Sequence, residues 1–254
     1  MADVEFEVVQ PGVGRLLLNR PGKRNAVSAE MITALTELVN GAEVASQSAV
    51  VLVGAGSTFC AGIDLTQIAR PGHRADPTAA SRLFGALRQT GPVLIAAVEG
   101  YALGLGSGLA MACDLVIAAD DATFGYPEIR HDLVAGVTMV GLREIVGPRR
   151  AMEYLVTGRQ IGAHEANDVG MVNQMVPSGD AFARSLSLAG EIAQHSTPAV
   201  QMTRQLLHGS AGASYVEAIE VGEAAVLAAR ADRLRAATTD IDRARDRAHS
   251  EGAP

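Results

Sequence analysis

The most informative stretch of the chain is residues 93–119, VLIAAVEGYALGLGSGLAMACDLVIAA. Two continuously apolar runs within it, Val93–Val98 and Leu115–Ala119, are typical of buried strands with both faces covered. Between them lie a glycine-rich turn and Ser107–Cys113, which we expect to form a short buried helix. The order strand, glycine loop, helix, strand occurs twice in the first half of the chain. This order predicts an α/β fold of stacked units that share one core.

Hydrophobic patterning predicts further elements on both sides of this stretch. Val4–Val9 and Gly14–Leu18 are expected to pair as a hairpin, and Ala49–Val53 to form another buried strand. Ser28 is the expected N-cap of a helix that follows the hairpin. The second half is predicted to be mainly helical. The candidate helices there are Val137–Val146, Arg149–Thr157, Ala163–Asp168, Asp180–His195, Pro198–Leu207 and Tyr215–Ala236.

Composition and charge restrict the class of protein. A chain of 254 residues is long enough for one α/β domain with a helical extension. The net charge of −7 argues against nucleic acid or an anionic membrane as a partner. The N-terminus lacks the basic segment and apolar run of a signal peptide, and no apolar run has membrane-spanning length. Cys60 and Cys113 do not make a disulfide framework or a metal-binding spacing, so we expect a cytoplasmic protein with free thiols.

One carboxylate follows the glycine-rich turn at a fixed distance. The turn is GLGSG at 104–108, and its backbone can be approached closely because three of its five residues are glycine. Glu128 ends the segment FGYPE at 124–128, where apolar and aromatic neighbours would desolvate it. Backbone N–H donors stabilise an oxyanion, and a positioned carboxylate transfers a proton. The pattern therefore indicates enolate chemistry.

Four segments of the chain resemble the crotonase superfamily, also called the enoyl-CoA hydratase/isomerase family, in their order and spacing. These segments are 18–26 (LNRPGKRNA), 59–65 (FCAGIDL), 100–114 (GYALGLGSGLAMACD) and 124–128 (FGYPE). The resemblance implies an α/β fold, a crotonase-like spiral of ββα turns. It implies that residues 1–195 form the spiral core. Residues 196–254 would form a C-terminal helical region for trimerisation and active-site cover.

The resemblance also implies the ligand and its site. The ligand is an acyl-CoA thioester, so coenzyme A is part of the substrate, and no separate cofactor or metal is expected. The backbone N–H groups of Ile63 and Leu105 would form the oxyanion hole, with Glu128 as the catalytic carboxylate. Family members usually assemble as a homotrimer or a dimer of trimers. The residues expected along the coenzyme A are Lys23, Arg24, Ala26, Ala61, Gly62, Asp64 and Leu65.

Position 108 departs from the pattern of the well-known hydratases. Those enzymes place two glutamates around a water molecule; one corresponds to Glu128, and the other falls at Gly108. A single carboxylate is enough to shift a double bond from 3-enoyl to 2-enoyl. Glu128 can remove the C2 proton and return it to C4 while the two N–H groups hold the enolate. We therefore expect isomerisation of an unsaturated acyl-CoA, with Glu128 as the only proton shuttle.

Two alternatives stay open at this point. In the first, the chain is a 2-enoyl-CoA hydratase in which His131, Asp132 or a water molecule fulfils the missing acid–base role. In the second, it binds acyl-CoA without turnover. A buried carboxylate argues against a pure binding protein, because such a protein loses desolvation energy and gains nothing from the charge.

Overall fold

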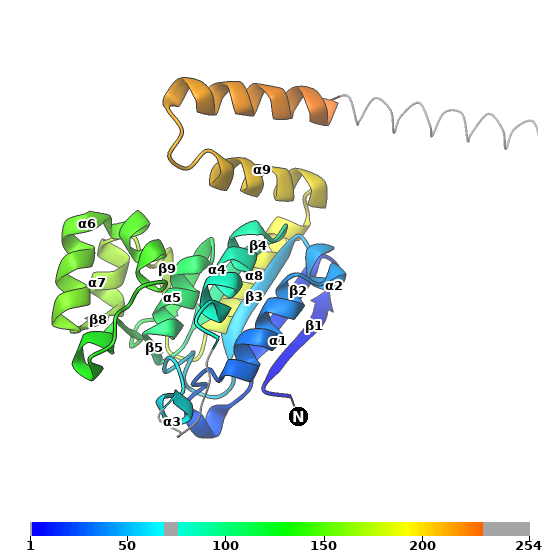
Figure 1. Ribbon diagram of the computed structural model, residues 1–254. Helices are drawn as coiled ribbons and strands as arrows, with labels where there is room; N and C mark the ends of the chain where they lie inside the picture. The colour runs from blue at the N-terminus through cyan, green and yellow to red at the C-terminus, as the bar shows by residue number, and fades with distance from the viewer. Residues whose placement is uncertain (1, 69–75, 231–254) are drawn as a thin grey trace, which may run out of the picture. The chain divides into compact units, whose positions relative to one another are not determined.

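The computed structural model of the chain describes residues 2–68 and 76–230 (Figure 1). The chain divides into two compact units, residues 1–201 and 202–254. The first unit contains two β-sheets, and the candidate site lies within it.

The larger sheet has six strands in the order β1-β2-β3-β4-β6-β9. β1 and β2 form the predicted antiparallel hairpin, and all later neighbours are parallel. The three apolar runs predicted to be buried strands form β3, β4 and β6, with Gly54 added to the end of β3. The bounds are β1 (Val4–Gln10), β2 (Val13–Leu18), β3 (Ala49–Gly54), β4 (Val93–Val98), β6 (Leu115–Ala119) and β9 (Gln174–Val176).

The strands of a second sheet, with three short strands, alternate along the chain with the later strands of the large one. β5 comes directly after β4, β7 comes directly after β6, and these two strands are parallel neighbours. The chain thus steps twice from the large sheet to the small one, and each time continues into a helix. This arrangement confirms the predicted α/β fold of ββα turns. The bounds are β5 (Tyr101–Leu103), β7 (Thr123–Gly125), β8 (Gln160–Gly162), α5 (Leu105–Ala112) and α6 (Met139–Thr157).

Helices cover both faces of the large sheet, which explains why its central strands are apolar throughout. Val50 and Leu52 of β3 belong to the core cluster that includes residues of α1 (Ala29–Val39) and α4 (Ala79–Gln89). Val51 on the same strand belongs to the cluster beneath α8 (Ala181–Ala193), which packs on β3, β4 and β6 (Figure 1). Successive side chains of a strand point to opposite faces, so a strand covered on both sides needs no polar residue.

The helix boundaries follow capping and proline signals. Ser28 is the predicted N-cap of α1, and its hydroxyl accepts a hydrogen bond from the N–H of Met31 at 3.2 Å. The two helices predicted before and after residue 148 form one element, α6, with a break in helical geometry at Gly147 (φ 75°) before Pro148. The remaining short elements are η1 (Pro21–Lys23), α2 (Ala42–Ala45), α3 (Leu65–Ile68), η2 (Pro127–His131), α7 (Ala163–Asp168) and α9 (Thr197–Gly209).

The second unit contains a helix over residues 215–230. The sequence predicted a helix over 215–236, and residues 231–236 lie outside the described part of the chain. Val216 and Leu227 on this helix are exposed. The oligomerisation role expected for residues 196–254 stays a prediction. Within the described residues, no helix combines the length and apolar character that crossing a bilayer requires.

The first turn of α5 lies against the backbone at residue 60. The N–H of Cys60 donates to the carbonyl of Tyr101 at 2.9 Å, and the N–H of Leu103 donates to the carbonyl of Cys60 at 3.0 Å. Residue 60 therefore extends the small sheet beside β5. A Cβ atom on Gly106 would overlap with the carbonyl oxygen of Cys60, so only glycine fits there.

We expect Gly106→Ala to destabilise the chain by about 1–3 kcal/mol, because either α5 or the loop at Cys60 must move. Gly85→Ala is the matched control, since Gly85 lies in α4 and a Cβ there meets no atom within 4 Å. We expect the control to stabilise by about 0.5–1 kcal/mol through helix propensity. Urea unfolding measures both variants, and equal free energies of unfolding for the two would contradict the close contact.

Candidate functional site

A cavity of about 320 Å³ lies where the loops that follow β3, β5 and β7 meet. Its lining is mainly apolar, with glycines at 62, 104 and 136. Ile63, Leu105 and Glu128, which the sequence predicted to act together, all line this cavity. The fold thus brings the two expected donor residues and the expected carboxylate to one place.

Glu128 is held at the beginning of η2, directly after Pro127. Its Oε1 accepts a hydrogen bond from the hydroxyl of Thr138 at 3.1 Å. Its Oε2 is buried and has no hydrogen-bond partner among the described residues. Of the described residues that line the cavity, Glu128 carries the only carboxyl group. A carboxylate with one oxygen anchored and one unpaired is arranged to accept a proton from a bound ligand.

The two candidate oxyanion donors come from adjacent loops. Gly62 has φ +103°, and a Cβ there would lie 2.9 Å from the carbonyl oxygen of Leu103 and 3.9 Å from the nitrogen of Leu105. Glycine therefore allows the loop before Ile63 to approach the start of α5. Leu105 is the first residue of α5, where N–H groups have no partner within the helix and the helix dipole favours negative charge.

Position 108, where the second glutamate of the well-known hydratases would stand, is tightly enclosed. A Cβ on Gly108 would lie 2.9 Å from Cζ of Phe84 and 3.0 Å from both Cβ and Cγ2 of Thr138. Such separations require a neighbour to move. The space next to Gly108 is therefore occupied, because the ring of Phe84 and the methyl group of Thr138 lie there.

The two segments expected along the coenzyme A are joined by backbone hydrogen bonds. The N–H of Ala61 donates to the carbonyl of Arg24 at 2.9 Å, and the N–H of Val27 donates to the carbonyl of Gly62 at 2.8 Å. Lys23 and Arg24 are exposed, and Ala26 is half-buried. Lys23, Arg24 and Ala26 do not line the cavity, whereas Ala61, Gly62 and Leu65 do.

Asp64 is buried, and its carboxylate is engaged within the protein. Oδ1 accepts from the hydroxyl of Thr66 at 2.6 Å and from its N–H at 3.1 Å, and Oδ2 accepts from the guanidinium of Arg20 at 3.2 Å. The Thr66 hydroxyl first, and then Arg20, hold the pKa of Asp64 below its ordinary value despite burial. The side chain stabilises the loop next to Ile63.

We expect Asp64→Ala to lower the free energy of unfolding by about 1–3 kcal/mol near neutral pH. Because the folded-state pKa of Asp64 lies below the ordinary value of about 4, its contribution is present above that pH. The contribution is lost as pH falls through the folded-state pKa. Urea unfolding from pH 7 downward should therefore show a smaller acid-induced loss in the variant.

Asp76→Ala is the matched control for this measurement. Asp76 also accepts from a threonine, Thr78, and from an arginine, Arg82, but it is exposed. We expect this control to change stability less than Asp64→Ala. An equal effect would mean that burial of Asp64 is not what gives its interactions their strength.

Of the two residues considered as a second acid or base, only one lines the cavity. His131, at the end of η2, is exposed and lines the cavity. Asp132 follows with a left-handed backbone (φ 54°), ends η2, and does not line the cavity. The cavity therefore contains one imidazole beside the carboxylate of Glu128, and the sequence alone could not choose between the two.

Two other ionisable groups near the cavity are held in their neutral forms. Burial raises the pKa of the Cys60 thiol to about 12, although the N–H of Gly62 donates to its sulfur at 3.4 Å. Burial, together with the negative charge of Glu128, raises the pKa of Tyr126 well above its ordinary value. Among the described residues, the Tyr126 hydroxyl has no hydrogen-bond partner. Neither group is a nucleophile or a base near neutral pH.

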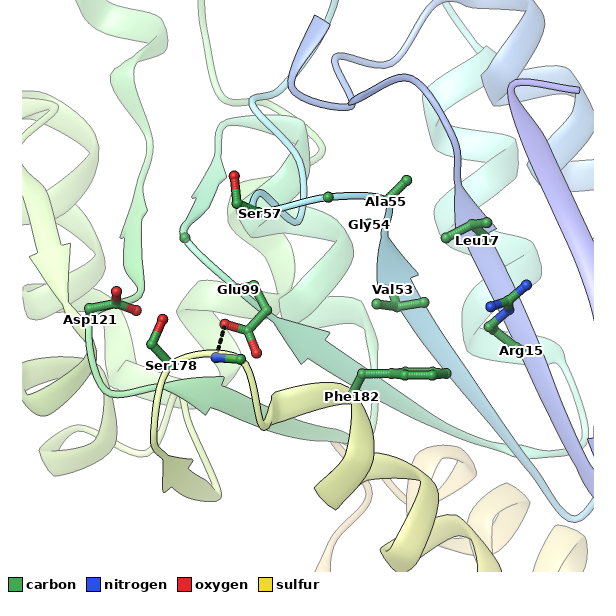
Figure 2. A pocket seen from close by; sticks show the side chains of 13 residues that line it. Arg15, Leu17, Val53, Gly54, Ala55, Ser57, Glu99, Asp121, Ser178 and Phe182 are labelled. Atoms are coloured by element: carbon green, nitrogen blue, oxygen red, sulfur yellow. Dashed lines mark hydrogen bonds between the residues drawn. The ribbon is translucent and has the colours of Figure 1, made fainter. Parts of the chain in front are cut away.

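A second cavity, of about 630 Å³, lies at the ends of β3 and β4 and the beginning of α8 (Figure 2). Figure 2 shows the Glu99 carboxylate beside Ser178, with Arg15 and Phe182 on the other side. Glu99 accepts from the N–H of Gly179 at 3.0 Å and of Ala181 at 2.9 Å, so it caps α8. This cavity is larger, but none of the predicted site residues lines it.

Sequence reasoning did not identify three residues that hold the site together. Thr138 binds the carboxylate of Glu128, ten positions earlier. The side chain of Asn25 is buried and donates to the carbonyls of Ala55 and Thr58 at 3.0 and 2.6 Å. Arg20 reaches Asp64 and the carbonyl of Ala26. Arg20 and Asn25 lie within a segment that the family resemblance singled out, which was the available signal. Thr138 lies outside all four segments.

Comparisons with known proteins show what the chain is similar to. A model of the enoyl-CoA hydratase/isomerase family matches residues 9–233. The 2,3-dehydroadipyl-CoA hydratase of Escherichia coli (strain K12) is 38% identical over 202 residues, which cover 77% of this chain and 78% of that protein.

Among residues 2–68 and 76–230, no group of three or more His, Cys, Asp or Glu side chains is placed to hold a metal ion.

Solved structures show the same fold. An enoyl-CoA hydratase from Mycobacterium smegmatis has a TM-score of 0.84 at 30% identity, covering 90% of this chain and 91% of that chain. A protein from Thermobifida fusca YX, solved in complex with acetoacetyl-CoA, has a TM-score of 0.83 at 28% identity, covering 91% and 96%. These matches span most of the chain, so they confirm both the resemblance and the crotonase-like fold.

Proposed function

The chain belongs to the enoyl-CoA hydratase/isomerase family, and we propose that it converts a 3-enoyl-CoA thioester into the 2-enoyl isomer. The observation that supports this choice is the single carboxyl group among the described residues that line the cavity. At the position of a second one, Gly108, a side chain would require Phe84 and Thr138 to shift. Isomerisation needs one group that removes and returns a proton, whereas hydration needs a second group to handle water.

In the proposed mechanism the thioester oxygen accepts hydrogen bonds from the N–H groups of Ile63 and Leu105. Glu128 removes the C2 proton, and the electron pair of that C–H bond moves toward the carbonyl, giving a dienolate. The same carboxylate then delivers the proton to C4, and the double bond moves to C2–C3. No water is consumed, and no group is oxidised. Loss of one oxyanion donor typically lowers such a rate by about 100- to 1,000-fold.

The proposed substrate carries coenzyme A along the joined segments at residues 23–26 and 61–65. Exposed Lys23 and Arg24 supply positive charge on a chain whose net charge is −7, so they suit the phosphates of the coenzyme. Leu65, Leu133 and Val137 in the cavity lining suit an apolar acyl group. The structure from Thermobifida fusca YX in complex with acetoacetyl-CoA supports this class of ligand.

Hydration of a 2-enoyl-CoA is the second candidate function. Two observations favour it: relatives such as the Escherichia coli protein are named hydratases, and His131 lines the same cavity as Glu128. A neutral imidazole nitrogen accepts a proton from water, which activates the water oxygen as a nucleophile. In that case His131 would accept a proton from water as the water oxygen adds to C3, and Glu128 in its protonated form would deliver its proton to C2. Transfer of a proton from His131 to Glu128 would then restore the site.

We expect Glu128→Gln to lower kcat by about 100- to 10,000-fold, because the amide cannot accept the C2 proton. The dissociation constant of a saturated acyl-CoA should change by less than about threefold, since glutamine has nearly the same size. Steady-state kinetics and calorimetric titration measure the two quantities. Glu37→Gln on the exposed face of α1 is the control. Unchanged turnover in Glu128→Gln would remove the proposed role of this carboxylate.

The two candidate reactions are separated by mass spectrometry of products formed in heavy water. From a 3-enoyl-CoA we expect the 2-enoyl isomer with no added water, and with deuterium only to the extent that the proton on Glu128 exchanges with the solvent before its delivery to C4. His131→Gln should keep this activity within about threefold, because His131 is not the proton shuttle. A hydrated product as the main species in the wild type, lost in His131→Gln, would favour the hydratase instead.

A further inference from the structure

We propose that Thr138 is the positioning residue of Glu128 and that its side chain restricts the cavity to one acid–base group. The inference rests on the proposed role of Glu128 as the proton shuttle. It assigns separate tasks to the two branches of one side chain. The hydroxyl orients the carboxylate, and the carbon branch occupies the space of a second acid.

The hydroxyl of Thr138 binds Glu128 and does not cap α6. Thr138 is the N-cap of α6, a position where threonine usually accepts a hydrogen bond from the first turn. Within the described part of the chain its side chain makes no such capping bond. It donates instead to Oε1 of Glu128 at 3.1 Å, and the residue is almost completely buried and lines the cavity.

This hydrogen bond distinguishes the two oxygens of Glu128. Oε1 is engaged by Thr138, whereas Oε2 has no partner among the described residues. Gly104 adjoins the same carboxylate, because a Cβ there would lie in van der Waals contact with Oε1, at 3.4 Å. A carboxylate held in this way presents one oxygen for both proton transfers, so it need not reorganise between C2 and C4.

The carbon branch of Thr138 closes position 108. A Cβ on Gly108 would lie 3.0 Å from Cβ and Cγ2 of Thr138 and 2.9 Å from Cζ of Phe84. Cζ is the far end of a side chain that can turn aside. Cγ2 of Thr138 branches from a Cβ that is fixed by the backbone at the beginning of α6, so this methyl group is the stronger obstacle to a side chain at 108.

The first test separates the hydroxyl from the shape of the side chain. Thr138→Val keeps the branched shape and removes the donor, whereas Thr138→Ser keeps the donor. We expect Thr138→Val to lower kcat for isomerisation by about 10- to 100-fold, the usual range for a hydrogen bond to a charged group. KM should stay within about threefold, and Thr138→Ser should keep kcat within about threefold.

A purely structural role would give a different result. The hydroxyl does not cap α6, so Thr138→Val should lose only the hydrogen bond to Glu128, and we expect the variant to stay folded at the assay temperature with kcat lowered and KM kept. If the valine variant does not fold, Thr138→Ala removes the same donor with less bulk and takes its place. Wild-type kcat in the variant without the hydroxyl, or equal losses in the serine and valine variants, would overturn the positioning role.

The second test asks what Thr138 excludes. Hydration breaks the C2–C3 π bond of a 2-enoyl-CoA, adds the water oxygen to C3 and places a proton on C2, so it benefits from a second carboxylate. We expect Gly108→Glu alone to be destabilised and to gain little hydratase activity. The double variant Gly108→Glu with Thr138→Ser loses the Cγ2 contact and keeps the hydroxyl that holds Glu128, and its hydratase activity should exceed that of Gly108→Glu by at least about tenfold. Equal activities would overturn the exclusion.

Glu128→Gln, assayed in the same series, separates this inference from the proposed function. An active Glu128→Gln variant removes the proposed function and the inference with it. An inactive Glu128→Gln variant together with an unaffected Thr138→Val variant removes only the inference about Thr138. The expected result is that both variants are impaired, with Glu128→Gln the more severe.

Discussion

The backbone hydrogen bonds between residue 60, β5 and β7 are the constraint on which the site depends. Both the N–H and the carbonyl of Cys60 form hydrogen bonds with β5. These bonds align the loop containing Ile63 with the beginning of α5. At the other edge of β5, the N–H of Gly104 donates to the carbonyl of Gly125 at 2.8 Å, three residues before Glu128. The two expected amide donors and the expected carboxylate, which come from three segments far apart in the sequence, are therefore held in one region, as catalysis by preorganised dipoles requires.

Much of the large sheet could be predicted from the sequence, and little of the small one. β3, β4 and β6 are continuous apolar runs, and a strand covered on both faces leaves that pattern clearly. β5, β7 and β8 have three residues each, too few to show any period, and were not predicted. They exist because neighbouring ββα turns pair their backbones, which is a property of the assembled core.

The candidate site also has a part that could be predicted from the sequence and a part that could not. Glu128, Ile63 and Leu105 could be identified because they lie in segments with a family-like order, and the structure brings them to one cavity. The absence of a side chain at Gly108 was also evident from the sequence. The sequence did not show that Thr138 and Phe84 fill the adjoining space. Thr138 lies 30 residues after Gly108 and Phe84 lies 24 residues before it, and no local pattern records such contacts.

Because the expected oxyanion donors are peptide N–H groups, their chemistry does not depend on which side chain the residue carries. Ile63 and Leu105 both face the cavity, so mutations there would reshape the space for the acyl group while the donors persist. Natural selection acting on such a scaffold can diversify substrate preference and reaction rate almost independently. Substitutions at these two positions can thus change which thioester is bound while the peptide N–H groups remain in place.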